Sequence, residues 1–270
     1  MDNASDIRNK ETKLEELIKA AGKLAVAFSG GVDSTYLLAV AHEVLKDQAV
    51  AVTVRSSVIP EREFEEACAF CRKLGVKQIV IDADVFAVEH FAENPPDRCY
   101  HCKKNLFTKI RDAVAGSGIT CVCDGTNADD TDDYRPGMRA LAELGILSPL
   151  KEAGITKKMI RERSKDLGLP TWDHPSMACL ASRFAYGETI TEEGLRAVEK
   201  AEDLLRTKGF AQYRVRVHGS LARIEVMPED RSRLLDMAEE IGAGLKTLGF
   251  SYVTMDLRGY RTGSMNEVLG

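Results

Sequence analysis

The stretch KLAVAFSGGVDS (residues 23–34) decides the fold of this chain. An apolar run from Leu24 to Phe28 ends in a small polar loop, and the apolar segment Tyr36–Leu45 follows at once. This order predicts a strand, a loop and a helix. Gly30 and Gly31 let the loop backbone approach an anion without a Cβ in the way. The loop N–H groups and the helix N-terminus would supply donors and a partial positive charge.

Polar side chains of the same loop complete a predicted nucleotide site. Ser29 and Ser34 add hydroxyl donors, and Asp33 can help to hold Mg²⁺. The loop lacks the Lys-Ser/Thr ending of a Walker A motif, so transfer of a γ-phosphoryl group is not the expected reaction. The sequence SGGVDS resembles the PP-loop of ATP pyrophosphatases, which cleave ATP between the α and β phosphates and adenylate a substrate. This resemblance implies that Ser29, Gly30, Gly31, Asp33 and Ser34 bind ATP.

The composition is that of an ordinary globular protein. The 270 residues are 44% hydrophobic and 29% charged, which fits one large or two moderate domains. A net charge of −5 and a pI near 5.7 argue against a protein built mainly to bind nucleic acid. The polar N-terminus and the lack of a long apolar run predict neither a secretion signal nor a membrane span. We expect a cytoplasmic enzyme whose seven cysteines are thiols, metal ligands or core residues rather than disulfides.

Short apolar strands alternate with helical patterns in the first half of the chain. Further strands are expected at 49–54, 78–81 and 119–123, and helices at 60–74, 100–114 and 156–167. This alternation predicts an α/β fold with a parallel sheet covered on both faces. The PP-loop resemblance implies an adenine nucleotide alpha hydrolase-like domain. Because ligands bind at the carboxyl ends of such strands, Val54 and Arg55 are expected to border the adenine, and Thr126 and Asn127 to contact nucleotide or substrate.

The pattern changes from Thr191 onward. A helix at 192–208, two alternating strands at 213–217 and 222–226, a helix at 228–248 and a strand at 252–257 form a predicted α+β module. We therefore expect a PP-loop domain over residues 1–187 and an α+β domain for substrate binding or oligomerisation over residues 188–270.

Four of the cysteines fit an apolar core better than a metal site. Cys68 and Cys71 lie on the apolar stripe of the helix predicted at 60–74. Cys121 and Cys123 share one face at the end of a predicted strand. Whether Cys68 and Cys71 join a second metal site stays open.

Cys99 and Cys102 differ because cations surround them. They form a C-x-x-C at a predicted helix entrance, where Arg98, Lys103 and Lys104 favour thiolates over thiols. Such a pair can bind metal or carry out redox chemistry.

Cys179 lies in the predicted connecting loop HPSMACLASR (174–183), close to Arg183. A loop cysteine beside an arginine and just ahead of a domain boundary is a candidate nucleophile. The alternative is a cysteine with no chemical role.

Several spaced motifs extend the resemblance over nearly the whole chain. PSMACLASR (175–183), DGTNADD (124–130) followed by DYRPG (133–137), and RVRVHG (214–219) together resemble the LarE family of sulfur transferases. That family implies an ATP-dependent pyridinium-3,5-bisthiocarboxylic acid mononucleotide synthase, which acts in biosynthesis of the nickel-pincer cofactor of lactate racemase. The implied reaction adenylates each carboxylate of a pyridinium dicarboxylic acid mononucleotide, releases pyrophosphate and exchanges AMP for sulfur.

The resemblance implies two possible sulfur sources. In one branch of the family a loop cysteine, matching Cys179 here, gives up its own sulfur and becomes dehydroalanine. In the other branch three cysteines, matching Cys99, Cys102 and Cys179, hold a [4Fe–4S] cluster in which one iron lacks a protein ligand and carries a sulfide. We favour the cluster, which also makes Cys179 both a metal ligand and a catalytic residue.

The second domain adds candidate substrate ligands. Arg214 and Arg216 share one face of a predicted strand, and the residues alone predict a solvated sheet face with cross-strand ion pairs. The resemblance implies instead that Arg214 and Arg216 bind the substrate phosphate, that Glu225 helps to hold a metal, and that Arg183 steadies the acyl-adenylate or AMP.

Three other functions compete with this hypothesis. An amidating synthetase is disfavoured because no glutaminase domain is fused to the chain. A tRNA thiolase shares adenylation and cysteine-borne sulfur, but the acidic balance and the lack of a long basic patch argue against bound RNA. A non-enzymatic ATP-sensing or scaffold module is the third alternative. Neither a membrane nor nucleic acid is expected as a partner. We expect a homo-oligomer and contacts with other enzymes of nickel-pincer cofactor biosynthesis.

Overall fold

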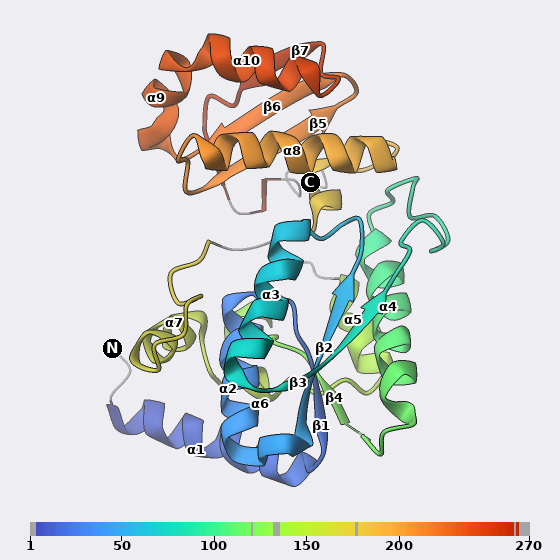
Figure 1. Ribbon diagram of the computed structural model, residues 1–270, viewed down its shortest axis with the longest axis vertical. Coiled ribbons are helices and arrows are strands. Elements are labelled where there is room, and N and C mark those ends of the chain that lie inside the picture. Colours follow the sequence, from blue (N-terminus) through green and yellow to red (C-terminus); the bar gives the residue numbers. More distant parts are fainter. Residues whose placement is uncertain (1–3, 120, 132–135, 176–177, 262, 265–270) are drawn as a thin grey trace. The chain divides into compact units, whose positions relative to one another are not determined.

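The computed structural model describes residues 4–119, 121–131, 136–175, 178–261 and 263–264. It divides into two compact units (Figure 1). The first unit holds residues 1–84 and 99–177, and the second holds residues 85–98 and 178–270. Ser176 and Met177 of the PSMACLASR motif, and residues 133–135 of the DYRPG motif, lie outside the described residues.

Strands and helices alternate along the first unit, as the sequence predicts. Its elements are α1 (Ala4–Ala21), β1 (Leu24–Ala27), α2 (Val32–Leu45), β2 (Ala49–Arg55), α3 (Glu61–Leu74), β3 (Lys77–Asp82), α4 (Arg98–Ala115), β4 (Cys121–Cys123), α5 (Pro136–Glu143), α6 (Pro149–Glu152) and α7 (Lys157–Asp166). In the described residues the four strands form one parallel sheet in the order β3-β2-β1-β4. The predicted α/β class with a parallel sheet is confirmed.

The strand that carries the PP-loop lies between two neighbours, so its carboxyl end is flanked on both sides. Ala25 of β1 pairs with Val50 of β2 and with Val122 of β4. Side chains alternate between the faces of a strand. Val26 and its neighbours therefore pack in a cluster with α1, α2, α3 and α7, whereas Ala25 packs in a second cluster with α4 and α5. Figure 1 shows α3 and α4 on opposite sides of the sheet.

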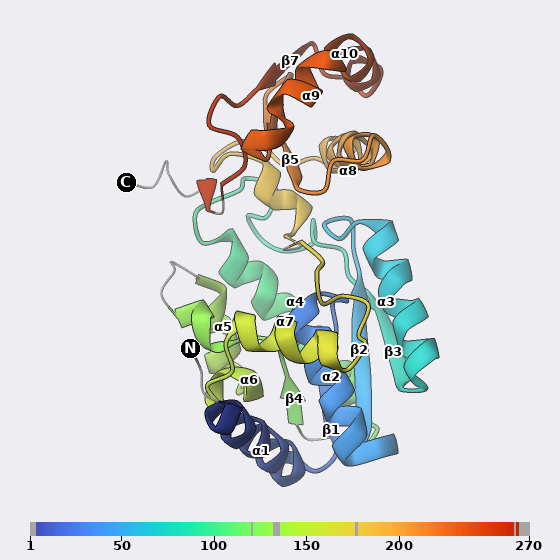
Figure 2. The ribbon, with the colours of Figure 1, turned by 90° about the vertical axis from the view of Figure 1, so that its left-hand side faces the viewer.

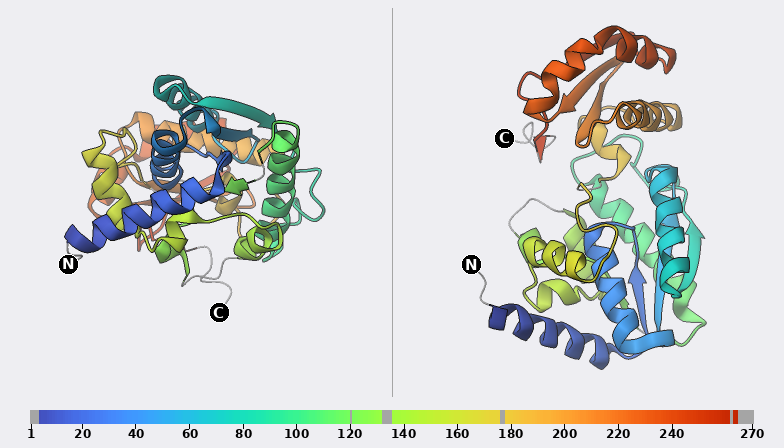
Figure 3. Two further views of the ribbon diagram at one scale, coloured as in Figure 1. Left: turned by 90° about the horizontal axis from the view of Figure 1, so that it is seen from below. Right: turned by 60° about the vertical axis from the view of Figure 1, so that its left-hand side comes forward.

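Some elements of the first unit differ from the sequence-based expectations. The charged N-terminal stretch, from which we predicted no element, forms α1, and this helix contacts α2 and α6 (Figure 3). Leu14 and Ile18, one turn apart on α1, are fully buried and make the helix amphipathic. The fourth strand is shorter than predicted and covers Cys121–Cys123.

The second unit is an α+β module. Its elements are α8 (Glu192–Thr207), β5 (Tyr213–His218), β6 (Leu221–Val226), α9 (Arg231–Asp236), α10 (Ala238–Thr247) and β7 (Tyr252–Met255). Where described, its strands form a sheet in the order β5-β6-β7, with β5 antiparallel and β7 parallel to β6. Helix α8 contacts β5, α10 contacts β7, and the two helices contact each other, so both cover one face (Figure 2). The helix expected at 228–248 is divided at Met237 into α9 and α10.

The second unit also includes residues 85–98, which come from the first half of the sequence. The Gly187 N–H donates to the Asn94 carbonyl at 3.0 Å, and the Ile190 N–H donates to the Ala92 carbonyl at 2.8 Å. The expected domain division at 187/188 does not include this segment and stays a prediction. Among the described residues, no helix has both the length and the apolar character needed to cross a membrane.

The packing predicted for Cys71, Cys121 and Cys123 is confirmed. Cys71 and Cys123 belong to the hydrophobic cluster that contains Val26 and residues of α2, and Cys121 packs against this cluster. Burial raises the pKa of the Cys71 thiol to about 12, with the nearby Cys68 as a second cause. Burial likewise raises the pKa of Cys123. Cys68 is only half-buried. Cys71 and Cys123 are thus neutral core residues at neutral pH.

The raised pKa of Cys71 predicts a loss of stability in alkali. In the unfolded chain this thiol ionises near pH 9, whereas in the folded protein it keeps its proton up to about pH 12. The unfolded state therefore binds fewer protons in this interval, so the free energy of unfolding decreases as pH rises. Urea unfolding between pH 8 and 10 should give a shallower decrease for Cys71→Ala than for the wild type. Leu74→Ala, on the same helix, is the control and should keep the wild-type slope; equal slopes for all three proteins would contradict the prediction.

Candidate functional site

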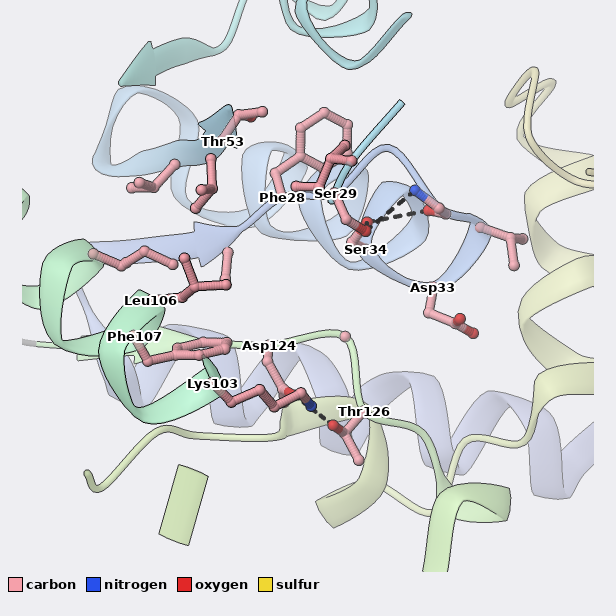
Figure 4. Close-up of a pocket in the computed structure, with 18 of the residues that line it drawn as sticks. Phe28, Ser29, Asp33, Ser34, Thr53, Lys103, Leu106, Phe107, Asp124 and Thr126 are labelled. Atoms are coloured by element: carbon pink, nitrogen blue, oxygen red, sulfur yellow. Dashed lines mark hydrogen bonds between the residues drawn. The ribbon is translucent and has the colours of Figure 1, made fainter. Parts of the chain in front are cut away.

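Hydrogen bonds of its own serine hydroxyl groups stabilise the conformation of the PP-loop. Helix α2 begins directly after Gly31, which leaves its first N–H groups at the loop. The Ser29 and Ser34 hydroxyls lie 3.1 Å apart, and the Ser34 hydroxyl donates to the Gly31 carbonyl at 3.1 Å (Figure 4). A preformed loop of this kind can receive phosphate oxygens without first being ordered.

Two glycines allow close backbone approach at this loop. Gly30 has a φ of +78°, which disfavours other residues, and a Cβ on it would lie 3.2 Å from the Ala67 Cβ of α3. A Cβ on Gly125 would lie 3.0 Å from the Ser34 backbone nitrogen. Helix α3 and the loop after β4 therefore pack directly on the PP-loop.

A cavity of about 370 Å³ opens beside the PP-loop, within the first unit (Figure 4). Its polar end holds the PP-loop with the loop that follows β4, and its apolar walls come from β2, α3 and α4. The residues that line it are Ala27, Phe28, Ser29, Gly31, Val32, Asp33, Ser34, Val52, Thr53, Val54, Ile59, Phe64, Lys103, Leu106, Phe107, Ile110, Asp124, Gly125, Thr126, Asp130, Lys157 and Pro175.

Most of the predicted ATP ligands of the first unit meet at this cavity. Ser29, Gly31, Asp33, Ser34, Val54 and Thr126 line it. Gly30 does not line the cavity, and it packs against α3 instead. Arg55 instead turns to α3, where it donates to Glu61 at 2.7 Å. The ATP-binding roles of these residues stay predictions.

Lys157 is a cavity residue that the sequence analysis missed. It is the first residue of α7, after the cap Thr156, whose hydroxyl accepts from the Met159 N–H. Its ammonium lies 2.5 Å from Asp33 Oδ2, and Asn127 Nδ2 donates to Asp33 Oδ1 at 3.3 Å. A lysine at a predicted helix start gives no sequence signal of this contact, because the PP-loop lies 124 residues earlier.

The loop DGTNADD connects the PP-loop to α7. Asp129 accepts from the Lys157 N–H at 2.7 Å, and the Asn127 N–H donates to Asp130 at 3.0 Å. Thr126 donates to Asp124, which also accepts from Ser148 at 2.7 Å. Thr126 and Asn127 are both buried. Thr126 lines the cavity, whereas Asn127 does not line it and contacts the site through Asp33.

Two of the three predicted cluster ligands lie on α4 near the cavity. Cys99 is four residues before Lys103, and Cys102 is four residues before Leu106, and both of these later residues line the cavity. Helical spacing places such pairs on the same side of α4. Cys99 and Cys102 are partly buried, whereas Cys179 is exposed and belongs to the second unit.

Arg183 holds the backbone around Cys179 in the second unit. Its guanidinium makes two bonds to Glu202 of α8, at 2.9 Å and 2.7 Å, and donates to the Ala178 and Cys179 carbonyls at 2.7 Å and 3.1 Å. Glu202 also accepts from the Val215 N–H. The predicted role of Arg183 toward AMP is untested, but the structure gives it a second task.

The polar face of the second sheet carries a buried charge network. Glu225 is fully buried and accepts from Arg216 at 3.0 Å, from Arg223 at 3.1 Å and from Ser264 at 3.2 Å. Arg214 stands over the Tyr260 ring, and burial together with the charge of Arg183 lowers its pKa. The cross-strand ion pairs expected from the residues alone are therefore present, but the prediction of a solvated face is wrong, because Arg214, Arg216 and Glu225 are all buried.

The metal-binding prediction for Glu225 stays a prediction, since arginines occupy both of its oxygens. Nowhere in the described ranges do three or more His, Cys, Asp or Glu side chains gather so that they could hold a metal ion. The candidate cluster ligands are divided between the two units.

The sheet, the SGGVDS loop at the end of its β1 strand and the cavity beside that loop define a PP-loop nucleotide-binding protein, and a PP-loop domain model matches residues 5–131. The chain is also 37% identical over 265 residues to the pyridinium-3,5-bisthiocarboxylic acid mononucleotide synthase of Lactiplantibacillus plantarum, across 97% of this chain and 96% of that protein. The chain belongs to this LarE family and is an ATP-dependent sulfurtransferase.

Two further relatives show the range of similarity to this chain. An uncharacterized protein of Synechocystis sp. is 43% identical over 265 residues, which cover 96% of this chain and 98% of that protein. A tRNA-specific 2-thiouridylase of Zymomonas mobilis is 26% identical over 187 residues, which cover 56% of this chain and 50% of that protein.

The position of Lys157 predicts a role in ATP binding. Replacing it in Lys157→Met removes the cation beside Asp33 and leaves less positive charge for the phosphates. We expect the Kd for ATP·Mg²⁺ to rise about 10- to 100-fold, the range of one lost charge-assisted contact. Isothermal titration calorimetry measures this change. Lys158→Met is the matched control, because Lys158 is exposed and pairs with Glu162; equal affinities for both variants would contradict the assignment.

Proposed function

We propose that this enzyme converts the carboxylates of a pyridinium dicarboxylic acid mononucleotide into thiocarboxylates, at the expense of ATP, in nickel-pincer cofactor biosynthesis. The observation that carries the proposal is a PP-loop cavity within a chain that aligns over 97% of its length with a named synthase of this kind. The cavity volume of about 370 Å³ lies in the range of small-molecule sites.

The first step would be adenylation in the first unit. A carboxylate oxygen of the substrate attacks the α-phosphorus of ATP, and pyrophosphate leaves. The PP-loop N–H groups with Ser29 and Ser34 would bind the leaving pyrophosphate, and Asp33 would hold Mg²⁺. The ion pair between Asp33 and Lys157 would then open, so that Lys157 turns from the carboxylate to a phosphate oxygen.

The second step would replace AMP by sulfur. We propose that Cys99, Cys102 and Cys179 bind a [4Fe–4S] cluster, because three thiolates suit iron and the first two each precede a cavity-lining residue of α4 by four positions. When bound, such a cluster with one iron open to solvent supplies a sulfide nucleophile.

Cys179 itself is a second candidate sulfur source, favoured by its exposure. Its Sγ would attack the activated carbonyl carbon, and AMP would leave. Loss of the Cys179 α-proton and cleavage of its Cβ–S bond would then release the thiocarboxylate and leave dehydroalanine. This route yields one sulfur per chain.

The direct test is anaerobic incubation with ATP, Mg²⁺, sulfide and pyridinium-3,5-dicarboxylic acid mononucleotide. Mass spectrometry should detect a thiocarboxylate product, together with pyrophosphate and AMP. Absence of product and of pyrophosphate release would refute the proposal. Binding of labelled tRNA at moderate salt, with thiolated tRNA as product, would favour a tRNA thiolase instead.

Iron content separates the two sulfur sources. Anaerobically purified wild-type protein should contain about four iron atoms per chain, with several product molecules formed per chain. Cys102→Ser should lose most of this iron, whereas the control Cys68→Ser, which changes the other C-x-x-C, should keep it. An iron-free wild type that loses the mass of H₂S from Cys179 would reverse the choice in favour of the sacrificial route.

Arg214 and Arg216 are proposed to bind the substrate phosphate. Arg214→Ala should raise the KM for the pyridinium substrate about 10- to 100-fold, the range of a charge-assisted contact. The KM for ATP should change less than about twofold, because the PP-loop lies in the other unit. Arg206→Ala, an exposed arginine of α8, is the control. Equal increases in both KM values would contradict the assignment.

A further inference from the structure

A segment from the first half of the chain forms part of the support of the Cys179 loop. Residues 85–98 lie between β3 and α4 in sequence but pack with residues 178–270. The backbone bonds from Gly187 to Asn94 and from Ile190 to Ala92 attach this segment to the stretch that follows Cys179. The sequence motifs gave no reason to expect this contact.

Asn94 is the centre of the attachment. It is fully buried and has a φ of +55°, a left-handed conformation that asparagine tolerates better than most residues. Its Nδ2 donates to the Ala185 carbonyl at 2.6 Å and to the Phe184 carbonyl at 3.3 Å. Its Oδ1 accepts from Arg98. Both ends of the side-chain amide are therefore used to hold a fixed geometry.

Arg98 extends the attachment toward Cys179. This arginine is 3% exposed, and its Nη1 donates to the Ala181 carbonyl at 3.0 Å as well as to Asn94. Ala181 is two residues after Cys179, and Arg98 directly precedes Cys99 in the chain. Within the second unit, a single buried guanidinium thus contacts both Asn94 and the stretch that follows Cys179.

Three side chains therefore hold the backbone at and after Cys179 by its carbonyl groups. Arg183, anchored on Glu202, binds the Ala178 and Cys179 carbonyls. Asn94 and Arg98 bind the carbonyls that follow. The Cys179 side chain nevertheless remains exposed. An exposed thiol on a tightly fixed backbone is the arrangement expected where a sulfur atom must be presented at one position.

We infer that Asn94 and Arg98 are positioning residues for sulfur transfer: they fix the Cys179 loop and have no part in adenylation. This inference rests on the proposed function, and it applies whether Cys179 ligates a cluster or gives up its own sulfur. Their partners lie within the second unit, whereas the PP-loop and its cavity lie in the first.

Asn94→Gly is the sharpest variant, because glycine accepts the left-handed backbone while the three side-chain hydrogen bonds are lost. Thiocarboxylate formation should fall about 10- to 100-fold, the loss expected when a reacting atom is misplaced by about 1 Å. Substrate-dependent pyrophosphate release should stay within about twofold of wild type. The rate at which iodoacetamide alkylates Cys179, followed by peptide mass spectrometry, should change severalfold as the loop is released.

His90→Gly is the matched control. His90 also has a left-handed φ, of +59°, in the same segment, but it is exposed and contacts Glu93. This variant should match the wild type in thiocarboxylate formation, pyrophosphate release and Cys179 alkylation. Arg98→Lys is a second test variant, because a lysine keeps the charge but cannot reproduce the planar guanidinium contacts. It should show the same separation of the two steps as Asn94→Gly.

The outcomes distinguish this inference from the proposed function. Wild-type rates of thiocarboxylate formation in folded Asn94→Gly and Arg98→Lys would overturn the inference and leave the function intact. Parallel loss of pyrophosphate release and of product would also overturn it, because the residues would then be merely structural. If the wild type forms no product at all, the proposed function is refuted. The positioning role can still be tested in that case, because unchanged Cys179 alkylation in both variants would refute it. Should Asn94→Gly not fold, Arg98→Lys decides alone.

Discussion

The nucleotide site depends on close backbone packing at two glycines. The PP-loop lies against α3 through Gly30 and against the loop after β4 through Gly125, and a Cβ at either position would meet its neighbour at 3.2 Å or 3.0 Å. Contacts this short are tighter than ordinary side-chain packing, so the neighbouring atoms would have to move to accommodate a Cβ. These contacts place the end of β1, the start of α2 and the DGTNADD loop around one cavity. The other contacts of the first unit, such as the ion pair of Lys157 with Asp33, are made to a loop whose position this packing fixes.

Charge pairing then orients the polar side chains at this cavity. Lys157 reaches the PP-loop because Asp129 holds the first N–H of α7 and Asn127 holds Asp33. In the second unit, Glu202 and Glu225 balance Arg183, Arg216 and Arg223 in a buried network. Buried guanidinium groups need such partners, because an unpaired buried charge is strongly unfavourable. The carboxylates therefore fix the orientation of the arginines as well as their charge.

The two proposed chemical tasks fall on different stretches of chain. The PP-loop, proposed to bind phosphate, lies between the regular elements β1 and α2 of the first unit. The Cys179 loop has little regular structure and is held instead by hydrogen bonds to its carbonyls from Asn94, Arg98 and Arg183. A loop fixed by side-chain donors can keep its thiol exposed, whereas a core element would bury it, as β4 buries Cys123.

The sequence by itself determined the α/β class, the parallel sheet, the PP-loop and the family, because each depends on a local pattern: apolar periodicity, a glycine pair or a short motif. It also placed Cys71 and Cys123 in the core correctly from helical spacing and strand alternation. Only the tertiary structure brought Lys157 to Asp33, 124 residues away, and residues 85–98 to the Cys179 loop. Such contacts join residues far apart in the chain through side chains of ordinary type, so no local pattern records them. The same reason explains α1, whose charged sequence becomes a helix against the core only once α2 and α6 are there to bury Leu14 and Ile18.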